Sequence, residues 1–382
     1  MHVIVIGAGA FGTWTARWLR RRGASVMLVD QYGAGNSLAS SGDESRVTRS
    51  AHGPDDHYPG WQRRSLEQWL QLDPQLLVRT GVLWLARHHD GFEARSAEVL
   101  ERRGIPIERL SPDEMAERWP QMSTGDLAWG LLEPEAGVLM ARRGVAATAR
   151  AFVEEGGVFR IGLARVEGTD VLIGDERLTA DAFVFAAGPW LPKLLGTVPG
   201  LELGVPQQEV IYFATPPGDT RFDAGNLPTW VEYDAAFYGL PSIEGRGFKI
   251  APDWPGPIVD PDRQERRVSD ERVEASRAYL RRRAPAIAGQ PVAEGRVCQY
   301  ELTADTHFII DRHPAMPAAW IVGGGSGHGF KHGPVVGEYV SALVMGDGTA
   351  VEELAPPDDR FALRLRAAVP GMRTSGVAPA EA

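Results

Sequence analysis

The sequence predicts an α/β protein in which a dinucleotide-binding domain with a parallel sheet is interleaved with a second, α+β domain built on an antiparallel sheet. A glycine-rich turn at residues 7–12 follows the first apolar segment. Short buried strands are expected near both ends and in the middle of the chain, at residues 3–6, 183–187 and 320–322. Residues 206–249 instead alternate between apolar and polar positions, as in an antiparallel sheet with one covered face.

Length and composition agree with two interleaved domains. The 382 residues exceed the ~250–300 at which a single hydrophobic core stops growing. Hydrophobic residues at 43% and charged residues at 24% exclude a disordered or fibrous protein. The net charge of −10 argues against a nucleic-acid or anionic-membrane binder, and no run of 18 apolar residues predicts a membrane span. We therefore expect a cytoplasmic protein that acts on a small molecule.

The glycine-rich turn has the surroundings of a phosphate-binding loop. It follows a predicted strand at Val3–Ile6 and opens a helix at residues 13–22. Gly7 permits a tight turn, Gly9 lets the backbone approach a pyrophosphate, and Gly12 allows close contact between helix and strand. The next strand, residues 25–30, ends in Asp30, where a carboxylate can accept hydrogen bonds from ribose hydroxyls. Both NAD and FAD bind to this arrangement, so it does not distinguish them.

Other elements follow from local patterns. Apolar residues at helical spacing predict a helix over residues 61–70, and short alternating runs predict strands at 210–214 and 230–233. The cluster Arg281-Arg282-Arg283 is expected to be a solvated helix end. The single cysteine excludes a disulfide within the chain and a multi-cysteine metal cluster, and His88-His89 lacks helical ligand spacing, so no metal site is expected.

Five further stretches carry a family resemblance. They are residues 40–46 (SSGDESR), 184–190 (VFAAGPW), 237–241 (FYGLP) with Lys249, 297–311 (VCQYELTADTHFIID) and 325–331 (GSGHGFK). In this order the chain resembles the FAD-dependent amine oxidase family of D-amino acid oxidase and glycine oxidase, most closely its monomeric sarcosine oxidase group. The resemblance implies a Rossmann-like FAD-binding domain at 1–84, 142–205 and 299–382, a substrate domain at 85–141 and 206–298, and a monomer.

The resemblance also implies how FAD is held. Cys298 matches the cysteine that forms a thioether with the flavin in sarcosine oxidases, and Arg46 matches an arginine over the flavin face. The residues expected to bind FAD are Gly7, Gly9, Gly12, Asp30, Ser41, Arg46, Val166, Gly188, Trp190, Cys298, Gly325, Gly327, Gly329, Phe330 and Lys331.

The expected catalytic residues are Arg49, Tyr238, Lys249, Asp253, Tyr300 and Lys331. By resemblance, Arg49 and Lys331 hold the substrate carboxylate, and a guanidinium suits this because it can bind both oxygens at once. Lys249 matches the lysine that activates oxygen, whose ammonium stabilises the charge that O2 acquires. Tyr238 and Tyr300 match residues that line the substrate pocket. His307 and His328 are expected to be structural.

Three departures limit what the resemblance implies about the substrate. Asp253 stands where sarcosine oxidases have a histidine, Ser40-Ser41 replace two histidines, and residues 42–46 contain one additional residue. A carboxylate near the substrate amine favours the ammonium form, whereas hydride loss needs the neutral amine. Asp253 is therefore expected to bind a basic or hydroxyl-bearing side chain of the substrate instead of its amine.

The leading expectation is therefore an FAD-dependent oxidase of a secondary or N-substituted amino acid other than sarcosine. Hydride passes to flavin N5, the imine is hydrolysed, and O2 becomes H2O2. Three alternatives remain open: a dehydrogenase of the same lineage that uses an electron carrier, a flavin-binding subunit without turnover, and a nicotinamide-dependent dehydrogenase.

Overall fold

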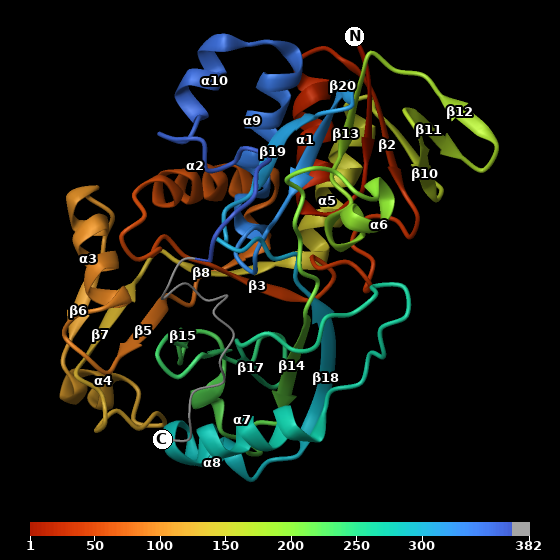
Figure 1. Cartoon of the computed structure of the whole chain (residues 1–382). Coiled ribbons are helices and arrows are strands. Elements are labelled where there is room, and N and C mark those ends of the chain that lie inside the picture. Colours follow the sequence, from red (N-terminus) through yellow and green to blue (C-terminus); the bar gives the residue numbers. More distant parts are fainter. Residues whose placement is uncertain (369–382) are drawn as a thin grey trace.

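Two large sheets organise the chain, and Figure 1 shows them one above the other. The computed structural model describes residues 1–368; the remainder of the expected range 299–382 lies outside the described residues. The first sheet has the order β19-β20-β13-β1-β2-β9, and all its pairs are parallel except β19 with β20. Its strands are β1 (His2–Ile6), β2 (Ser25–Asp30), β9 (Val158–Ile161), β13 (Ala182–Phe185), β19 (Ile309–His313) and β20 (Met316–Gly323).

Helices cover one face of this parallel sheet. The helix α1 (Ala10–Arg21) packs against α5 (Ala141–Glu154) and α9 (Gly333–Met345), and α9 packs against α2 (His57–Leu72) and α10 (Gly348–Leu354). The other face is covered by α6 (Leu191–Leu195) and by the antiparallel sheet of β10 (Ala164–Glu167), β11 (Asp170–Ile173) and β12 (Glu176–Leu178). Because both faces are buried, the parallel strands are continuous apolar runs, as the sequence predicts.

The second large sheet contains eight strands from two separate stretches of the chain, in the order β18-β14-β17-β16-β15-β5-β7-β6. All its pairs are antiparallel except β15 with β5. The strands are β5 (Val82–Ala86), β6 (Glu108–Leu110), β7 (Trp129–Glu133), β14 (Gln207–Phe213), β15 (Thr229–Glu232), β16 (Phe237–Leu240), β17 (Phe248–Pro252) and β18 (Val292–Gln299). The expected domain division remains a proposal, and its boundary at residue 84 falls inside β5.

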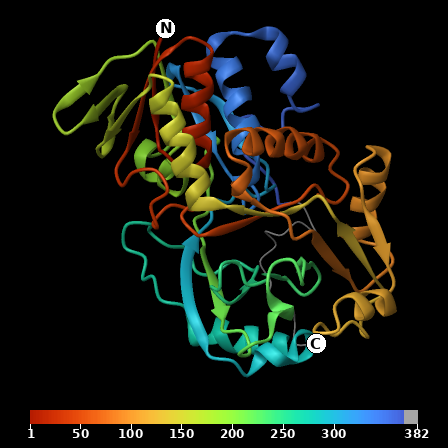
Figure 2. The same cartoon turned by 180° about the vertical axis from the view of Figure 1, so that it is seen from behind.

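Helices α4 (Pro112–Arg118), α7 (Asp270–Arg283) and α8 (Pro285–Ala288) bury one face of the eight-stranded sheet, and α3 (Phe92–Arg102) packs beside β5. The opposite face turns toward a small sheet of β3 (Ser45–Thr48), β8 (Gly137–Met140) and β4 (Leu77–Val78), which lies between the two large sheets in both views (Figures 1 and 2). Over residues 1–368, no helix is both long and apolar enough to cross a membrane.

One expectation about the second sheet is wrong. Arg283 is not solvated but fully buried at the end of α7, where it contacts Glu232 at 2.9 Å and Asp126 at 2.8 Å. Glu232 also accepts a hydrogen bond from the hydroxyl of Tyr279 at 2.6 Å. A charge is buried here because it is paired and hydrogen-bonded on several sides.

Candidate active site

A cavity of about 560 Å³ lies at the carboxyl ends of the parallel strands, where dinucleotides bind in folds of this kind. We call it the cofactor cavity. Twelve of the residues expected to bind FAD line it: Gly7, Gly9, Asp30, Ser41, Arg46, Val166, Gly188, Trp190, Gly325, Gly327, Gly329 and Phe330. The other three, Gly12, Cys298 and Lys331, do not line it.

The glycine-rich turn needs its glycines for steric reasons. Gly7 has a positive φ of 106°, and a Cβ there would lie 2.3 Å from the carbonyl oxygen of Ala186. A Cβ at Gly12 would lie 1.8 Å from the carbonyl oxygen of Gly7, so only a glycine at this position lets the helix pack this closely against the turn. The turn therefore brings the start of α1 close to β1 and β13 and directs backbone N–H groups toward the cavity.

Asp30 has a structural task in addition to the expected one. Its carboxylate accepts hydrogen bonds from the backbone N–H groups of Ala8 at 2.7 Å and of Tyr32 and Gly33 at 2.8 Å. These bonds tie the end of β2 to the glycine-rich turn. Asp30 also lines the cofactor cavity, so the same side chain holds the loop and faces the ligand space.

The donor and acceptor groups of the cofactor cavity fit a flavin dinucleotide. The buried hydroxyl of Ser41 and the Oε2 atom of the Glu301 carboxylate belong to residues that line this cavity, and neither atom has a hydrogen-bond partner among residues 1–368. Burial raises the pKa of Glu301 to about 7, although the backbone N–H groups of Gly325 and Gly324 oppose this shift. Buried polar groups are ordinarily hydrogen-bonded, so their lack of partners indicates that a polar ligand completes them.

A smaller cavity adjoins the cofactor cavity, and we call it the inner cavity. Arg46, Tyr300, Gly327 and Phe330 line both. All six expected catalytic residues and Cys298 line the inner cavity: Arg49, Tyr238, Lys249, Asp253, Cys298, Tyr300 and Lys331. The structure thus brings together residues that lie far apart in the sequence, at the place where the two large sheets face each other.

Strand alternation places Lys249 in the inner cavity. On β17, Phe248 and Ile250 point to the core beneath α7, so Lys249 and Ala251 point to the opposite face. Lys249 is 2% exposed. The alternation of side chains along β17 therefore buries the Lys249 ammonium on the face of the strand that borders the inner cavity.

The buried Lys249 is paired with Asp43, a residue to which the sequence assigned no role. The Nζ atom of Lys249 donates to the Asp43 carboxylate at 2.6 Å and to the carbonyl and hydroxyl oxygens of Ser45 at 3.1 Å and 2.9 Å. Arg46 donates to the same carboxylate at 2.7 Å. Burial alone would raise the pKa of Asp43, but Lys249 and Arg46 outweigh it and hold this pKa well below its usual range.

Arg49 and Lys331 are two further buried cations, 7% and 3% exposed. Arg49 donates to the carbonyl oxygen of Ala51 and lies over the ring of Trp84 at 5.2 Å. Lys331 donates to the carbonyl oxygen of His328 at 3.3 Å. Both cations line the inner cavity, and a positive charge attracts an anionic group more strongly in a partly buried site than in water.

The carboxylate of Glu133 supports the segment that carries Arg49. It accepts hydrogen bonds from the backbone N–H of Ser50 at 2.6 Å and from the indole N–H of Trp84 at 2.9 Å. Burial raises its pKa. Since Trp84 is also the ring beneath Arg49, one carboxylate fixes both the arginine's backbone and its packing surface.

Tyr300 and Asp253 contact each other, with the phenol donating to the carboxylate at 3.3 Å. Burial, followed by the charge of Asp253, raises the pKa of Tyr300 well above its ordinary value. Burial likewise raises the pKa of Tyr238. Both phenols are therefore neutral hydrogen-bond donors near neutral pH.

Cys298 is buried near the end of β18, and its Sγ atom lies 3.7 Å from the guanidinium of Arg46. It is adjacent in sequence to Gln299, whose carbonyl oxygen accepts a hydrogen bond from Ser40 at 2.7 Å. The thiol thus lies beside the junction of the cofactor cavity and the inner cavity.

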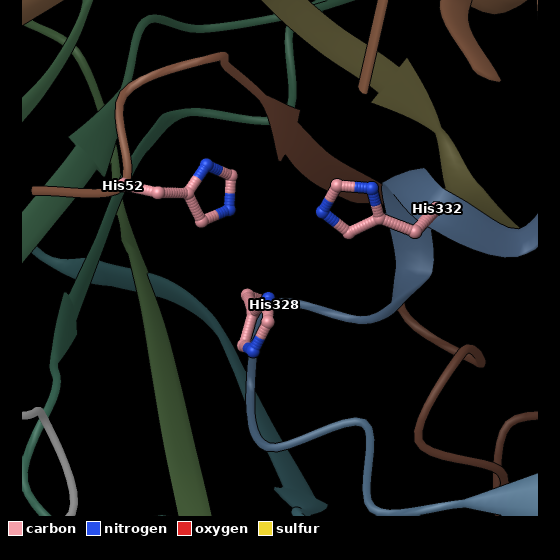
Figure 3. A group of neighbouring side chains, drawn as sticks. All are labelled: His52, His328 and His332. Atoms are coloured by element: carbon pink, nitrogen blue, oxygen red, sulfur yellow. The ribbon is translucent and has the colours of Figure 1, made fainter. Parts of the chain in front are cut away.

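Three histidines form a group next to the inner cavity that sequence reasoning missed. Figure 3 shows His52, His328 and His332 around one gap, each with a ring nitrogen directed toward it. One nitrogen of each ring lies within 4.8 Å of the corresponding nitrogens of the other two. His52 and His328 also line a third cavity, of about 80 Å³, together with Arg49, Asp253 and Tyr300.

The sequence holds a signal for part of this group. His328 and His332 stand four residues apart in the stretch before α9, a spacing that can place two metal ligands together, whereas His52 comes from the segment after β3 and only the fold brings it to them. The expectation of a structural role for His307 remains a prediction; its Nδ1 atom lies 2.9 Å from the hydroxyl of Tyr58. Asp43 stood inside a stretch chosen for its resemblance, three residues before Arg46, and that closeness to a basic residue was the available signal.

Comparison with known proteins gives consistent matches over nearly the whole chain. A family profile described as DAO, FAD dependent oxidoreductase, matches residues 2–343. The chain is 31% identical over 362 residues to the monomeric sarcosine oxidase of Bacillus sp. (strain B-0618), covering 90% of this chain and 92% of that protein. It is 32% identical over 368 residues to the monomeric sarcosine oxidase of Streptomyces avermitilis, covering 91% and 94%.

A solved structure shows the same fold. The deglycating enzyme fructosamine oxidase (Amadoriase II) of Aspergillus fumigatus superposes with a TM-score of 0.78 at 22% identity, covering 96% of this chain and 94% of that one. The expected fold class, FAD as the cofactor and an oxidoreductase activity are thereby confirmed, which sets aside the nicotinamide-dependent alternative. With a cofactor cavity at the switch point of its parallel sheet and a collinear match from residue 2 to residue 343, the chain belongs to the DAO family of FAD dependent oxidoreductases.

Proposed function

We propose that this protein is an oxidase of a secondary or N-substituted amino acid. The observation that carries the proposal is the pair of buried cations, Arg49 and Lys331, in an inner cavity that shares its wall with the cofactor cavity. Two relatives at 31% and 32% identity are named monomeric sarcosine oxidases. An N-methyl or otherwise N-substituted amino acid is therefore the substrate class that we infer, and the proposal includes a monomer.

In this proposal Arg49 and Lys331 bind the substrate carboxylate. A guanidinium can donate two parallel hydrogen bonds to it, and the ammonium adds a second positive charge. Fixing the carboxylate orients the neighbouring C–N bond toward the side of the inner cavity that Arg46, Tyr300 and Gly327 share with the cofactor cavity.

The surrounding charge also sets the protonation of the substrate amine. Arg46, Arg49 and Lys331 disfavour the ammonium and so lower the pKa of a bound amine, which supplies the lone pair that hydride loss requires. Asp253 acts in the opposite direction, so we propose that it accepts a hydrogen bond from a donor on the substrate side chain.

The overall reaction balances with water and oxygen as co-reactants. The substrate carbon loses a hydride and the amine loses a proton, and water hydrolyses the resulting imine to a carbonyl compound and an amine. When bound, FAD would supply the two-electron acceptor. In the overall reaction O2 receives the two electrons, takes up two protons and becomes H2O2. Lys249 provides a fixed positive charge near the negative charge that oxygen acquires.

We further propose that Cys298 attaches FAD covalently through a thioether. The new C–S bond would replace the S–H bond of Cys298 and one C–H bond of a flavin methyl group, and O2 would accept the two electrons and two protons released and become H2O2. Its burial beside Arg46, at the edge of the shared wall, supports this, as does the absence of any other cysteine in the sequence. The remaining residues that would hold FAD are those that line the cofactor cavity.

Anaerobic mixing tests the proposal. The purified yellow protein is mixed without oxygen with a panel of N-methyl, cyclic and glycated amino acids, and the flavin absorbance is followed. Bleaching by at least one of these compounds, followed by recovery of the colour and release of H2O2 when air is admitted, is expected. Bleaching without rapid recovery in air would instead identify the dehydrogenase. Failure of the whole panel to bleach the flavin would reject the proposal in favour of a subunit without turnover.

A further inference from the structure

His52, His328 and His332 present unshared electron pairs to a common gap. The Nδ1 atom of His52 lies 2.8 Å from the carbonyl oxygen of Ser50, and the Nε2 atom of His328 lies 2.9 Å from that of Thr306. A carbonyl oxygen only accepts, so each of these nitrogens carries the hydrogen. In each neutral ring the other nitrogen, Nε2 of His52 and Nδ1 of His328, is then left with a lone pair.

These lone pairs have no donor within the part of the chain that the structure describes. Nε2 of His52, Nδ1 of His328 and both ring nitrogens of His332 are buried there without a hydrogen-bond partner. His332 is 0% exposed, so water in bulk does not satisfy it either. Unpartnered buried polar atoms are rare in folded proteins, and three neighbouring rings that share this property indicate a missing ligand.

The rings are neutral and oriented as metal-binding imidazoles are. Burial, aided by the charges of Arg49 and Lys331, lowers the pKa of each of the three rings well below the ordinary value. Histidines that ligate metals typically donate their second N–H to a backbone carbonyl or carboxylate, which fixes the tautomer. His52 and His328 already have this arrangement.

We propose that His52, His328 and His332 bind one divalent transition-metal ion, such as Zn²⁺ or Cu²⁺, through three ring nitrogens, with a fourth position open to the neighbouring cavity. Three imidazoles and an open position are a set that Zn²⁺ accepts, with Zn–N distances of about 2.0–2.1 Å. The nitrogens lie within 4.8 Å of one another, so small rotations of the side chains would close the site.

Neighbouring charges decide what occupies the fourth position. Arg49 and Lys331 oppose a bare dication, because like charges repel more strongly in a partly buried site than in water. They favour an anion beside the metal, so we infer that hydroxide or chloride completes the coordination. Occupancy would also engage the cations that the proposed function assigns to the substrate carboxylate. The metal is therefore expected to inhibit turnover reversibly.

The test uses the holoenzyme, freed of adventitious metal with a chelator, and needs no substrate. One equivalent of Cu²⁺ is added, and the electron paramagnetic resonance spectrum is recorded; Zn²⁺ binding is measured in parallel by calorimetry. We expect nitrogen hyperfine structure from three imidazoles and a stoichiometry of one. Replacement of a single ligand, in His332→Leu or separately in His52→Gln, should weaken binding by at least about 10-fold.

The matched control is a double variant, His88→Gln with His89→Gln, which removes the exposed histidine pair outside the cluster. It should bind as wild type does. Wild-type protein that takes up less than one tenth of an equivalent of metal, or a spectrum unchanged in both ligand variants, would overturn the proposal. Because the readouts are spectroscopic and calorimetric, failure of the proposed amine oxidation would leave this result independent.

Discussion

The ammonium of Lys249 and the guanidinium of Arg46 share one carboxylate oxygen, Oδ2 of Asp43, at 2.6 Å and 2.7 Å. The cation proposed to assist oxygen is therefore not isolated, since half of the local positive charge is neutralised. Asp43 also accepts a hydrogen bond from Tyr212 at 3.3 Å. This carboxylate both positions the two cations and sets the net charge beside the flavin site.

Asp43→Asn removes that negative charge, so it should stabilise the electron-rich reduced flavin. We expect the midpoint potential to rise by about 30 mV, which corresponds to ~1.4 kcal/mol for a two-electron couple. Redox titration of the holoenzyme measures it. Glu44→Gln is the control, because Glu44 pairs with Arg142 and Arg296 instead. An equal or lower potential in the Asn variant would contradict the proposed balance of charge.

Arg49→Gln tests carboxylate recognition. Loss of a charged hydrogen bond of about 1.5–3 kcal/mol predicts that kcat/KM for the amino acid falls by roughly 10- to 100-fold. Steady-state kinetics should place most of this loss in KM, since the carboxylate is bound equally before and during the chemical step. The matching amine without a carboxylate serves as the control substrate, and Arg49→Gln should not slow its oxidation. An equal loss with both substrates would reject the assigned role.

Acid precipitation tests the flavin linkage at Cys298. The yellow colour should stay with the precipitated wild-type protein and move to the supernatant in Cys298→Ser. Absorbance of the two fractions gives the answer directly. If wild-type protein releases its flavin on precipitation, the thioether does not exist and the cofactor is held by the cofactor cavity alone.

Buried neutral histidines predict acid sensitivity. Burial lowers the pKa of His57 to about 4, and those of His52, His328 and His332 lie well below the ordinary value of 6.5. Below pH ~6.5 the unfolded chain binds protons that the folded protein does not, so stability is greatest above that pH and falls as the pH decreases.

Each such histidine contributes a slope of up to about 1.4 kcal/mol per pH unit. Urea unfolding between pH 5 and pH 7.5 measures the total slope. His57→Phe should reduce it by close to one histidine's share, whereas the exposed His89→Gln should leave it unchanged. An unchanged slope in His57→Phe would mean that this ring titrates normally in the folded state.

Glu232→Gln tests the buried charge network behind the inner cavity. The variant leaves the fully buried Arg283 with weaker compensation, and breaking such a pair typically costs about 3–5 kcal/mol. Denaturant unfolding should show a loss near the lower value, because Asp126 still pairs with Arg283. The exposed pair of Glu101 with Arg109 supplies the control, and Glu101→Gln should change stability by less than about 1 kcal/mol.

The sequence predicts the parallel sheet more accurately than the second sheet. The strand at residues 25–30 has the expected bounds. Its apolar run lies between the end of a helix and a terminal acidic residue, and these two features define where the strand begins and ends. The parallel pairing of β15 with β5 could not be foreseen, since it joins residues far apart in the sequence and no local pattern encodes it. The prediction that Arg283 is solvated was wrong for the same reason, because its partner Glu232 lies on another element.

The order in which the chain is made gives the inner cavity one more property. Its cations and thiol come from β3, β17, β18 and the turn before α9, so no segment that ends before Lys331 contains a complete set. During synthesis the site cannot form before Lys331 has been made. A product that stops before this residue would be expected to lack the complete site and to retain no cofactor colour.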